Sequence, residues 1–314
     1  MSGYLLEGRW HGGWYDTTRS GGEFQRAESR FRRWVTADGS SGFEAEPGRY
    51  HLYVSLACPW AHRTLILRKL KALEEIVGVS VVDPVMHDQG WEFSDGPGCV
   101  PDSVNGFRYL HQLYAAAAAD YSGRATVPVL WDKKSATIVN NESAEILRMF
   151  NSAFDAYTAV KTDYYPRRLH ARIDEINQFI YRDVNNGVYR CGFAGTQAAY
   201  ERAFDALFSA LDWIERHLER GPYLVGEAIT EADWRLFTTL VRFDAVYCLH
   251  FKCNLRRIAD YPRLSRYVRE LYRVPGVAAT ANMDHIKRHY YMSHRHLNPS
   301  GIVPKGPVLE FEQG

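Results

Sequence analysis

The sequence predicts an α/β domain that is followed by an all-helical domain. Residues 50–155 contain short aromatic and β-branched runs around helical segments, which is typical of alternating strands and helices. Residues 160–296 instead show apolar side chains at helical spacing, and glycine and proline separate the successive segments. A chain of 314 residues is long enough for two domains, so we expect one on either side of residue 155.

The first domain is predicted to have the order βαβ, insertion, ββα. The expected elements are strand 50–54, helix 64–70, strand 79–82, strands 126–131 and 136–139, and helix 144–151. The insertion, residues 84–124, is loop-rich apart from a helical stretch at 110–120. An insertion of this length in a compact domain is usually functional or a lid. Pro128 interrupts its strand, which indicates an edge, a bulge or a special turn.

Two less regular segments flank these domains. Residues 1–49 are rich in glycine, arginine and aromatic residues, and we expect an arm that packs its rings on the body, because disordered segments are poor in aromatics. Residues 297–314 are predicted to form an extended tail. In the helical half the expected helices are 165–184, 198–219, 231–249, 261–273 and 277–290, with breaks that include Gly187, Gly192, Gly195 and Gly226.

The composition argues against a nucleic-acid-binding or membrane-surface protein. The net charge is +1, 24% of the residues are charged, and no block carries one sign. The N-terminus lacks a long apolar segment, so we expect neither a signal peptide nor a membrane span. The five cysteines are odd in number and form no Cys-x-x-Cys pair, which favours a reducing compartment, the cytoplasm.

Cys58 occupies the turn between the first predicted strand and the helix after it, with Pro59 in the first helical turn. Free N–H groups at a helix start favour negative charge, so we expect the pKa of the Cys58 thiol to lie below that of a free cysteine. The thiolate is the reactive form, which makes Cys58 the candidate nucleophile. The alternative is a small buried apolar residue, as free cysteines often are.

Several motifs give the sequence a resemblance to a known family. A βαβ–ββα unit with Cys-Pro at its first turn and Val-Pro before its third strand resembles the thioredoxin fold. The helical half, with PYLVG at 222–226 and TEAD at 230–233, resembles the soluble glutathione transferases. Five motifs resemble more narrowly the glutathionyl-hydroquinone reductases, the Xi class of these enzymes: CPWA at 58–61, HDQGW at 87–91, GRATVPVLWD at 123–132, NNES at 140–143 and NPSGIVP at 298–304.

The resemblance implies a glutathione site in the first domain, with glutathione as co-substrate. Val127-Pro128 resembles the cis-proline of the thioredoxin fold, which leaves the backbone of Val127 to pair with a bound peptide; an edge-strand proline is the alternative. Ser143 and the helix N-terminus would bind the γ-glutamyl carboxylate and Glu142 its ammonium group, unless these residues only cap the helix.

Trp91 and Arg124 belong to the same site by this resemblance. Trp91 would form a wall of the glutathione site, although a lone tryptophan is usually part of a core. Arg124 would pair with a glutathione carboxylate, or else only with a surface acid.

Tyrosines of the helical half are candidates for the second substrate. The resemblance places two tyrosines over the sulfur, and Tyr189 and Tyr290 match best, with Tyr291 as a neighbour that could replace Tyr290. Packing in the core is the alternative for each ring.

Thr230-x-x-Asp233 is expected to be a structural capping box. We expect no metal, because neither cysteine nor carboxylate completes a set with the histidines at 285, 289, 294 and 296.

The implied reaction is the reduction of glutathionyl-hydroquinones to hydroquinones through a Cys58–glutathione disulfide, with release of oxidised glutathione. Position 61 is alanine, so an external glutathione would have to resolve that disulfide. We expect these small molecules and a second copy of the chain, as a homodimer, to be the partners, and no nucleic acid or membrane. An Omega-like thioltransferase or dehydroascorbate reductase remains an alternative, as does a non-catalytic glutathione-fold protein.

Overall fold

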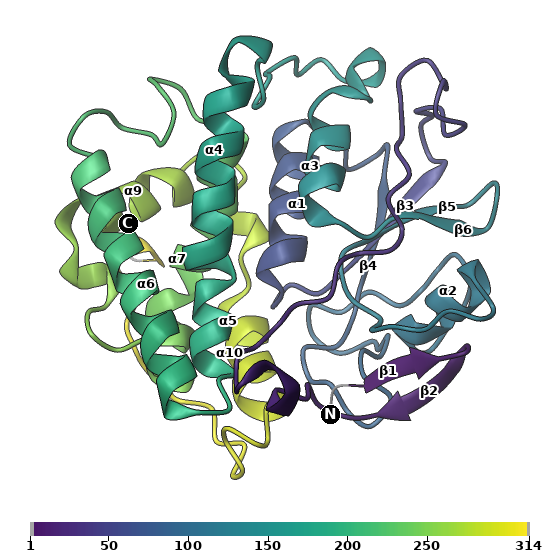
Figure 1. Ribbon diagram of the computed structural model, residues 1–314. Coiled ribbons are helices and arrows are strands. Elements are labelled where there is room, and N and C mark those ends of the chain that lie inside the picture. The colour runs from purple at the N-terminus through teal and green to yellow at the C-terminus, as the bar shows by residue number, and fades with distance from the viewer. Residues whose placement is uncertain (1–2, 313–314) are drawn as a thin grey trace. The chain divides into compact units, whose positions relative to one another are not determined.

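A mixed sheet is the frame of the first part of the chain in the computed structural model, which describes residues 3–312 (Figure 1). Its strands are β3 (Tyr50–Val54), β4 (Gly78–Val81), β5 (Val129–Asp132) and β6 (Thr137–Asn140). Their order across the sheet is β4-β3-β5-β6. β3 runs parallel to β4 and antiparallel to β5, and β5 is antiparallel to β6. All residues of the central strands β3 and β5 are buried, which places the core of this unit around them.

Helices complete the predicted order βαβ–ββα, which is confirmed. α1 (Pro59–Leu70) links β3 to β4, and α3 (Ser143–Ser152) follows β6 and packs against α1 (Figure 1). Within the insertion, α2 (Leu110–Ala117) packs against β6. β5 begins at Val129 and not at residue 126, because Pro128 has no N–H group to donate to the strand ladder.

The N-terminal arm is more regular than the sequence predicts. It begins with a hairpin of β1 (Gly3–Leu6) and β2 (Arg9–Gly12). Further along, the arm lies beside β6, where Arg33 N donates to Val139 O and Asn141 N donates to Phe31 O, each at 3.0 Å. These bonds satisfy backbone groups at the edge of the sheet that would otherwise lack partners within it.

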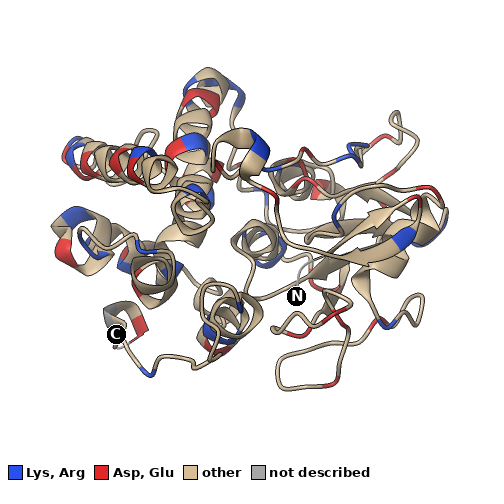
Figure 2. Cartoon of the chain, turned by 60° about the horizontal axis from the view of Figure 1, so that its bottom comes forward, with Lys and Arg blue, Asp and Glu red and all other residues tan. Residues whose placement is uncertain are grey.

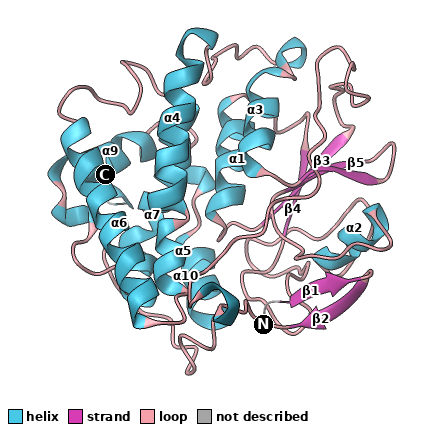
Figure 3. Cartoon of the chain, in the orientation of Figure 1, coloured by secondary structure: helices cyan, strands magenta, loops and turns pink. Residues whose placement is uncertain are grey.

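The second compact unit consists of residues 15–27, 163–278 and the described part of 304–314. Its helices are α4 (His170–Ile180), α5 (Gly187–Gly192), α6 (Gln197–His217), α7 (Glu231–Arg242), α8 (Cys248–His250) and α9 (Pro262–Tyr272). Figure 3 shows helices and strands in different colours, and every strand of the described residues belongs to the first unit. The predicted combination of a thioredoxin-like α/β part with an all-helical part is thus confirmed.

Glycine positions in the helical half differ from the sequence-based expectation. The segment between Gly187 and Gly192, predicted as a break, forms α5. A Cβ atom on Gly192 would lie 2.2 Å from the ring of Phe251, so this glycine permits close packing and does not end a helix. Two predicted helices, 165–184 and 231–249, are not α-helical throughout. α4 is followed by a π-helical turn at Tyr181–Asn185, and α7 is followed by one at Phe243–Tyr247.

α10 (Met283–Ser293) groups with the first unit and not with the predicted helical domain 160–296. The predicted arm, residues 1–49, is divided between the two units, since its residues 15–27 group with the second unit. Hydrogen bonds explain the position of α10. They join His285 Nε2 to Pro97 O at 2.7 Å, His289 Nδ1 to Pro84 O at 2.9 Å, and Met86 N to Ser293 Oγ at 2.9 Å.

Charged residues of both signs are interspersed along the helices and loops (Figure 2). This distribution agrees with the net charge of +1 and with the absence of one-sign blocks in the sequence. Over residues 3–312, no helix has both the length and the apolar character that crossing a membrane requires.

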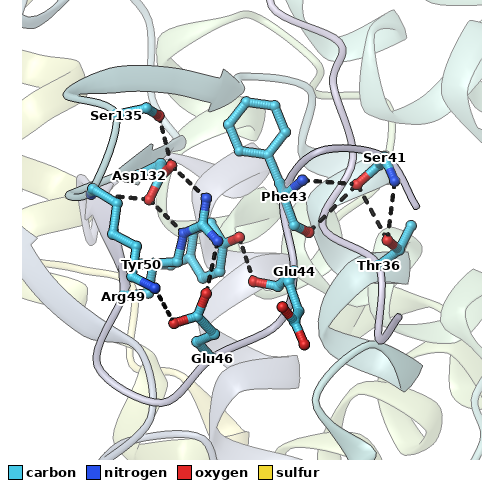
Figure 4. A network of polar contacts seen from close by, with 10 residues as sticks. Thr36, Ser41, Phe43, Glu44, Glu46, Arg49, Tyr50, Asp132 and Ser135 are labelled. Atoms are coloured by element: carbon cyan, nitrogen blue, oxygen red, sulfur yellow. Dashed lines mark hydrogen bonds and ion pairs between the residues drawn. The ribbon is translucent and has the colours of Figure 1, made fainter. Parts of the chain in front are cut away.

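An ion pair between half-buried Arg49, directly before β3, and buried Asp132, at the end of β5, joins these two strands (Figure 4). Arg49 donates from Nε and Nη2 to the two carboxylate oxygens of Asp132, each at 2.8 Å. Arg49 Nη1 also donates to Glu46 at 2.8 Å, and Ser135 Oγ donates to Asp132 at 2.6 Å. Burial alone would raise the pKa of Asp132, but the hydrogen bonds from Arg49 and Ser135 lower it to about 2.

We predict that this pair makes the protein sensitive to acid between pH 4 and pH 2. An unfolded aspartate has a pKa of about 3.9, so in this window the unfolded chain binds more protons and stability falls as the pH falls. The expected loss is about 2 kcal/mol, and urea unfolding of the wild type and Asp132→Asn from pH 6 to pH 2 measures it. Parallel pH curves for the two proteins would contradict the prediction.

The carboxylate of Asp233 in α7 accepts more hydrogen bonds than a capping box requires. It accepts from Thr230 N at 2.7 Å, as the predicted box requires, which confirms the structural role, and it accepts in addition from Thr230 Oγ1 at 3.0 Å. It also accepts from Leu224 N at 2.9 Å and from Tyr267 Oη at 2.8 Å. Burial raises the pKa of Asp233, while these donors act in the opposite direction.

Asp233→Ala should therefore lower the free energy of unfolding by more than the loss of an ordinary N-cap does. Removing the carboxylate leaves several buried donors without an acceptor, and we expect a loss on the order of 3–4 kcal/mol. Thr196→Ala is a matched control, because Thr196 caps α6 from a more exposed position by accepting from Ala199 N. Its expected cost is about 1 kcal/mol. Equal losses in chemical unfolding would show that Asp233 is only a cap.

Candidate active site

Cys58 is the N-cap residue of α1, directly after the turn that follows β3. Its backbone is extended, with φ −77° and ψ 121°, and Pro59 is the first helical residue. The carbonyl of Cys58 already accepts from His62 N at 2.9 Å, so the helix begins immediately behind the thiol. The side chain is half-buried. The predicted strand–turn–helix context is confirmed, and it gives the thiol the positive end of a helix dipole.

The backbone of Val127 lies beside this thiol. Cys58 Sγ donates to Val127 O at 3.6 Å, and the peptide bond between Val127 and Pro128 is cis, as the resemblance implied. Tyr53 lies opposite Val129 in the pairing of β3 with β5, so the chain after β3 and the chain before β5 meet at one end of the sheet. A peptide that pairs with Val127 would thus lie next to the sulfur.

Glu142 and Ser143 begin α3. Glu142 is its N-cap, and Oε1 accepts from Ala144 N at 3.0 Å, so the capping interpretation is observed. Glu142 Oε2 accepts from Ser29 Oγ of the arm at 3.1 Å, a contact that sequence reasoning missed because the two residues are far apart in the chain. Ser143 is buried, and its Oγ lies 3.5 Å from Glu142 Oε1. Binding of a carboxylate and an ammonium group at this helix start stays a prediction.

Arg124 contacts the N-terminal arm. Its Nη1 donates to Gly3 O at 3.2 Å and to Gly13 O at 3.3 Å. Carboxylates are the partners that the sequence predicts, whereas these acceptors are backbone carbonyls of the hairpin region. Arg124 therefore holds the arm in place, and its contact with glutathione stays a prediction.

Trp91 of the insertion is buried and packs on α10. Its indole stacks on the imidazole of His289, with ring centroids 4.7 Å apart and planes inclined by 21°. Trp91 O accepts from Leu110 N at 3.0 Å, which joins this loop to the start of α2. The contact with α10 was not predicted, since Trp91 and His289 are almost 200 positions apart in the sequence.

Tyr290 and Tyr291 lie on α10 and are almost fully buried, with 1% and 3% of their surface exposed. The ring of Tyr290 meets His294 edge to face at 5.5 Å. Tyr291 O accepts from Asn298 Nδ2 at 2.7 Å, which ties the motif at 298–304 to this helix. Both tyrosines group with the first unit, the unit that also contains Cys58.

Tyr189 belongs to the second unit, on α5. Its ring packs among aromatic residues, with centroids 5.7 Å from Phe193 and 5.4 Å from Phe251. The guanidinium of Arg26 lies over the same ring at 4.8 Å, a cation–π contact that the sequence did not indicate. The other predicted site residues all group with the first unit.

The four histidines in α10 and just after it, at 285, 289, 294 and 296, form aromatic contacts and hydrogen bonds. His294 and His296 pack on Trp14 of the arm, at centroid distances of 5.4 and 4.0 Å. Across the described residues, no group of three or more histidine, cysteine, aspartate or glutamate side chains is arranged to hold a metal ion.

Comparisons with known proteins agree with this architecture. The family model for the glutathione S-transferase N-terminal domain matches residues 57–153, and the model for the C-terminal domain matches residues 197–270. Glutathionyl-hydroquinone reductase YqjG of Escherichia coli K12 is 55% identical over 318 residues, which covers 99% of this chain and 97% of that protein. Glutathionyl-hydroquinone reductase PcpF of Sphingobium chlorophenolicum is 57% identical over 306 residues, with 98% and 96% covered.

Solved structures show the same relationship. The glutathione-bound structure of YqjG has a TM-score of 0.91 and 52% identity, with 99% of this chain and 97% of that chain covered. The Xi glutathione transferase from Phanerochaete chrysosporium has a TM-score of 0.88 and 53% identity, with 91% and 98% covered. This chain belongs to the glutathionyl-hydroquinone reductases, the Xi class of the glutathione transferases.

Proposed function

We propose that this protein reduces glutathionyl-hydroquinones to hydroquinones, with glutathione as the reductant and Cys58 as the nucleophile. The observation that carries the proposal is the position of Cys58 at the start of α1, with its sulfur 3.6 Å from the carbonyl of Val127. Relatives of 55% and 57% identity are named for this activity. The direct test is an assay with a glutathionyl-hydroquinone and excess glutathione that follows release of the free hydroquinone.

Glutathione would bind along the first unit with its sulfur facing Cys58. The backbone of Val127 pairs with the tripeptide, and the start of α3 with Ser143 receives the γ-glutamyl carboxylate. Glu142 would accept from the γ-glutamyl ammonium group, Trp91 would form a wall of the site, and Arg124 would pair with a carboxylate of the ligand.

The first half-reaction breaks the bond between the glutathione sulfur and the ring carbon of the keto tautomer. The Cys58 thiolate attacks the glutathione sulfur, a sulfur–sulfur bond forms, and the bonding electrons leave with the ring as an enolate. The hydroxyls of Tyr189 and Tyr290 donate to the enolate oxygen, with Tyr291 as the alternative to Tyr290. A tyrosine or water then protonates the enolate oxygen, which yields the hydroquinone, since the ring carbon already gained its proton in the keto tautomer.

The second half-reaction regenerates the thiolate. A second glutathione thiolate attacks the Cys58–glutathione disulfide and leaves as oxidised glutathione. Ala61 stands where a dithiol enzyme would have its second cysteine, so this step depends on an external thiol. Turnover in the cytoplasm, where thiols are kept reduced, and assembly as a homodimer are further parts of the proposal.

An Omega-like thioltransferase would use the same cysteine but a different second substrate. Comparing turnover of a glutathionyl-hydroquinone with that of a simple glutathione mixed disulfide separates the two functions. A non-catalytic glutathione-fold protein would show no glutathione adduct in intact-mass analysis after exposure to oxidised glutathione.

Cys58→Ser should abolish reduction and leave glutathione binding largely intact. Serine keeps the size of the side chain, but its hydroxyl stays protonated at neutral pH and cannot form the disulfide. Cys99→Ser is the control, since Cys99 is another half-buried cysteine of the first unit, and burial raises the pKa of its thiol. Turnover and intact mass after exposure to oxidised glutathione are the measurements. A Cys58→Ser protein that retains most of its turnover would refute the mechanism.

Tyr189→Phe and Tyr290→Phe should slow the hydroquinone reaction and spare the mixed-disulfide reaction. The ring oxygen gains charge only as the carbon–sulfur bond breaks, so losing one hydrogen bond lowers mainly kcat, by about 10²-fold or less. The attack of glutathione on the Cys58 disulfide has no such oxygen to stabilise. Steady-state rates with both substrates, with Tyr291→Phe measured alongside, test this prediction. Equal losses on both substrates would mean that the tyrosines hold the fold or the glutathione instead.

A further inference from the structure

The loop of the insertion that carries Trp91 is held against α10 by polar contacts on both sides of Trp91. Near its start, Pro84 O and Met86 N bond to side chains of α10, and further on Pro97 O bonds to His285 Nε2. Between these points the loop turns at Gly90, whose φ is +74°, and Trp91 follows directly. A segment with so little regular structure depends on such outside contacts for its order.

His289 of α10 contacts this loop in two ways. Its Nδ1 lies 2.9 Å from Pro84 O, and because a carbonyl only accepts, Nδ1 carries the proton. This bond orients the imidazole, and its face then stacks on the indole of Trp91 at 4.7 Å. The ring is 7% exposed, so both contacts are made away from solvent.

We propose that His289 is a positioning residue for glutathione recognition, and that it acts by holding the indole of Trp91 in place. The inference rests on the proposed role of Trp91 as a wall of the glutathione site. A wall made of one ring in an irregular loop contributes to affinity only if the ring is held before the ligand arrives. The stacked imidazole supplies that support from a helix, and the hydrogen bond to Pro84 fixes the imidazole in turn.

Two substitutions separate the stack from the hydrogen bond. His289→Asn keeps an N–H donor at the place of Nδ1 but removes the ring, and we expect the Kd of glutathione to rise about three- to tenfold. The saturated kcat with a glutathione mixed disulfide should stay unchanged. His289→Phe keeps a flat ring on Trp91 and loses the donor, so it should lower the Tm but hold the Kd within about twofold of wild type. Isothermal titration with glutathione measures Kd.

His285→Phe is the matched control, because His285 lies one turn earlier and also donates to a carbonyl of the insertion. It should lower the Tm without weakening glutathione binding. If the Kd rises in step with the loss of Tm across these three variants, or if His289→Asn binds glutathione as well as wild type, the inference is overturned.

The Trp91→Ala background distinguishes failure of this inference from failure of the proposed function. There His289→Asn should add no further loss of affinity, since the ring through which it acts is gone. An additional loss in that background would overturn the inference alone. If Trp91→Ala itself binds glutathione normally, Trp91 is not a wall of the site, and the proposed site and the inference both fail.

Discussion

The pairing of β3 with β5 is the constraint on which the geometry around Cys58 depends. With Tyr53 opposite Val129, the chain that leaves β3 and the chain that enters β5 meet at the same end of the sheet. This brings the thiol of Cys58, the N-cap residue of α1, against the carbonyl of Val127, although the two residues are far apart in the sequence. The Arg49–Asp132 pair holds the other end of the same two strands. A slip of one residue would turn every side chain of a strand to the opposite face, so the register also determines where the thiol lies.

The parts added to the basic βαβ–ββα unit all contribute contacts around the predicted site. The arm supplies Ser29 to Glu142 and the carbonyls that Arg124 binds, and α10 supplies the ring on which Trp91 packs. The sheet provides the rigid frame, and loops and terminal segments provide the side chains that meet the ligand. In this protein those loops are themselves held by polar contacts with distant segments.

Sequence reasoning predicted the features that are local. The strand–turn–helix at Cys58, the capping box at Thr230 and the order of strands follow from spacing and residue type within a few positions. Sequence reasoning did not predict α5, because glycine usually indicates a break between helices. Gly192 instead allows the helix to pack closely against Phe251. Sequence reasoning also missed the grouping of α10 with the first unit and the partners of Arg124, since contacts between remote segments leave no trace in periodicity. The motif resemblance supplied the candidate residues, and only a structure could supply what each of them touches.

Phe31 and Arg33 occupy the hydrogen-bonding edge of β6, a short strand with apolar Ile138 and Val139 at its centre. In a chain that began at residue 50, that edge would be open, and an open apolar edge is a template on which a second chain can add a strand. The arm thus works as protection against aggregation as well as a source of site contacts. Shortening it would change how the protein behaves at high concentration even where every residue near Cys58 is intact.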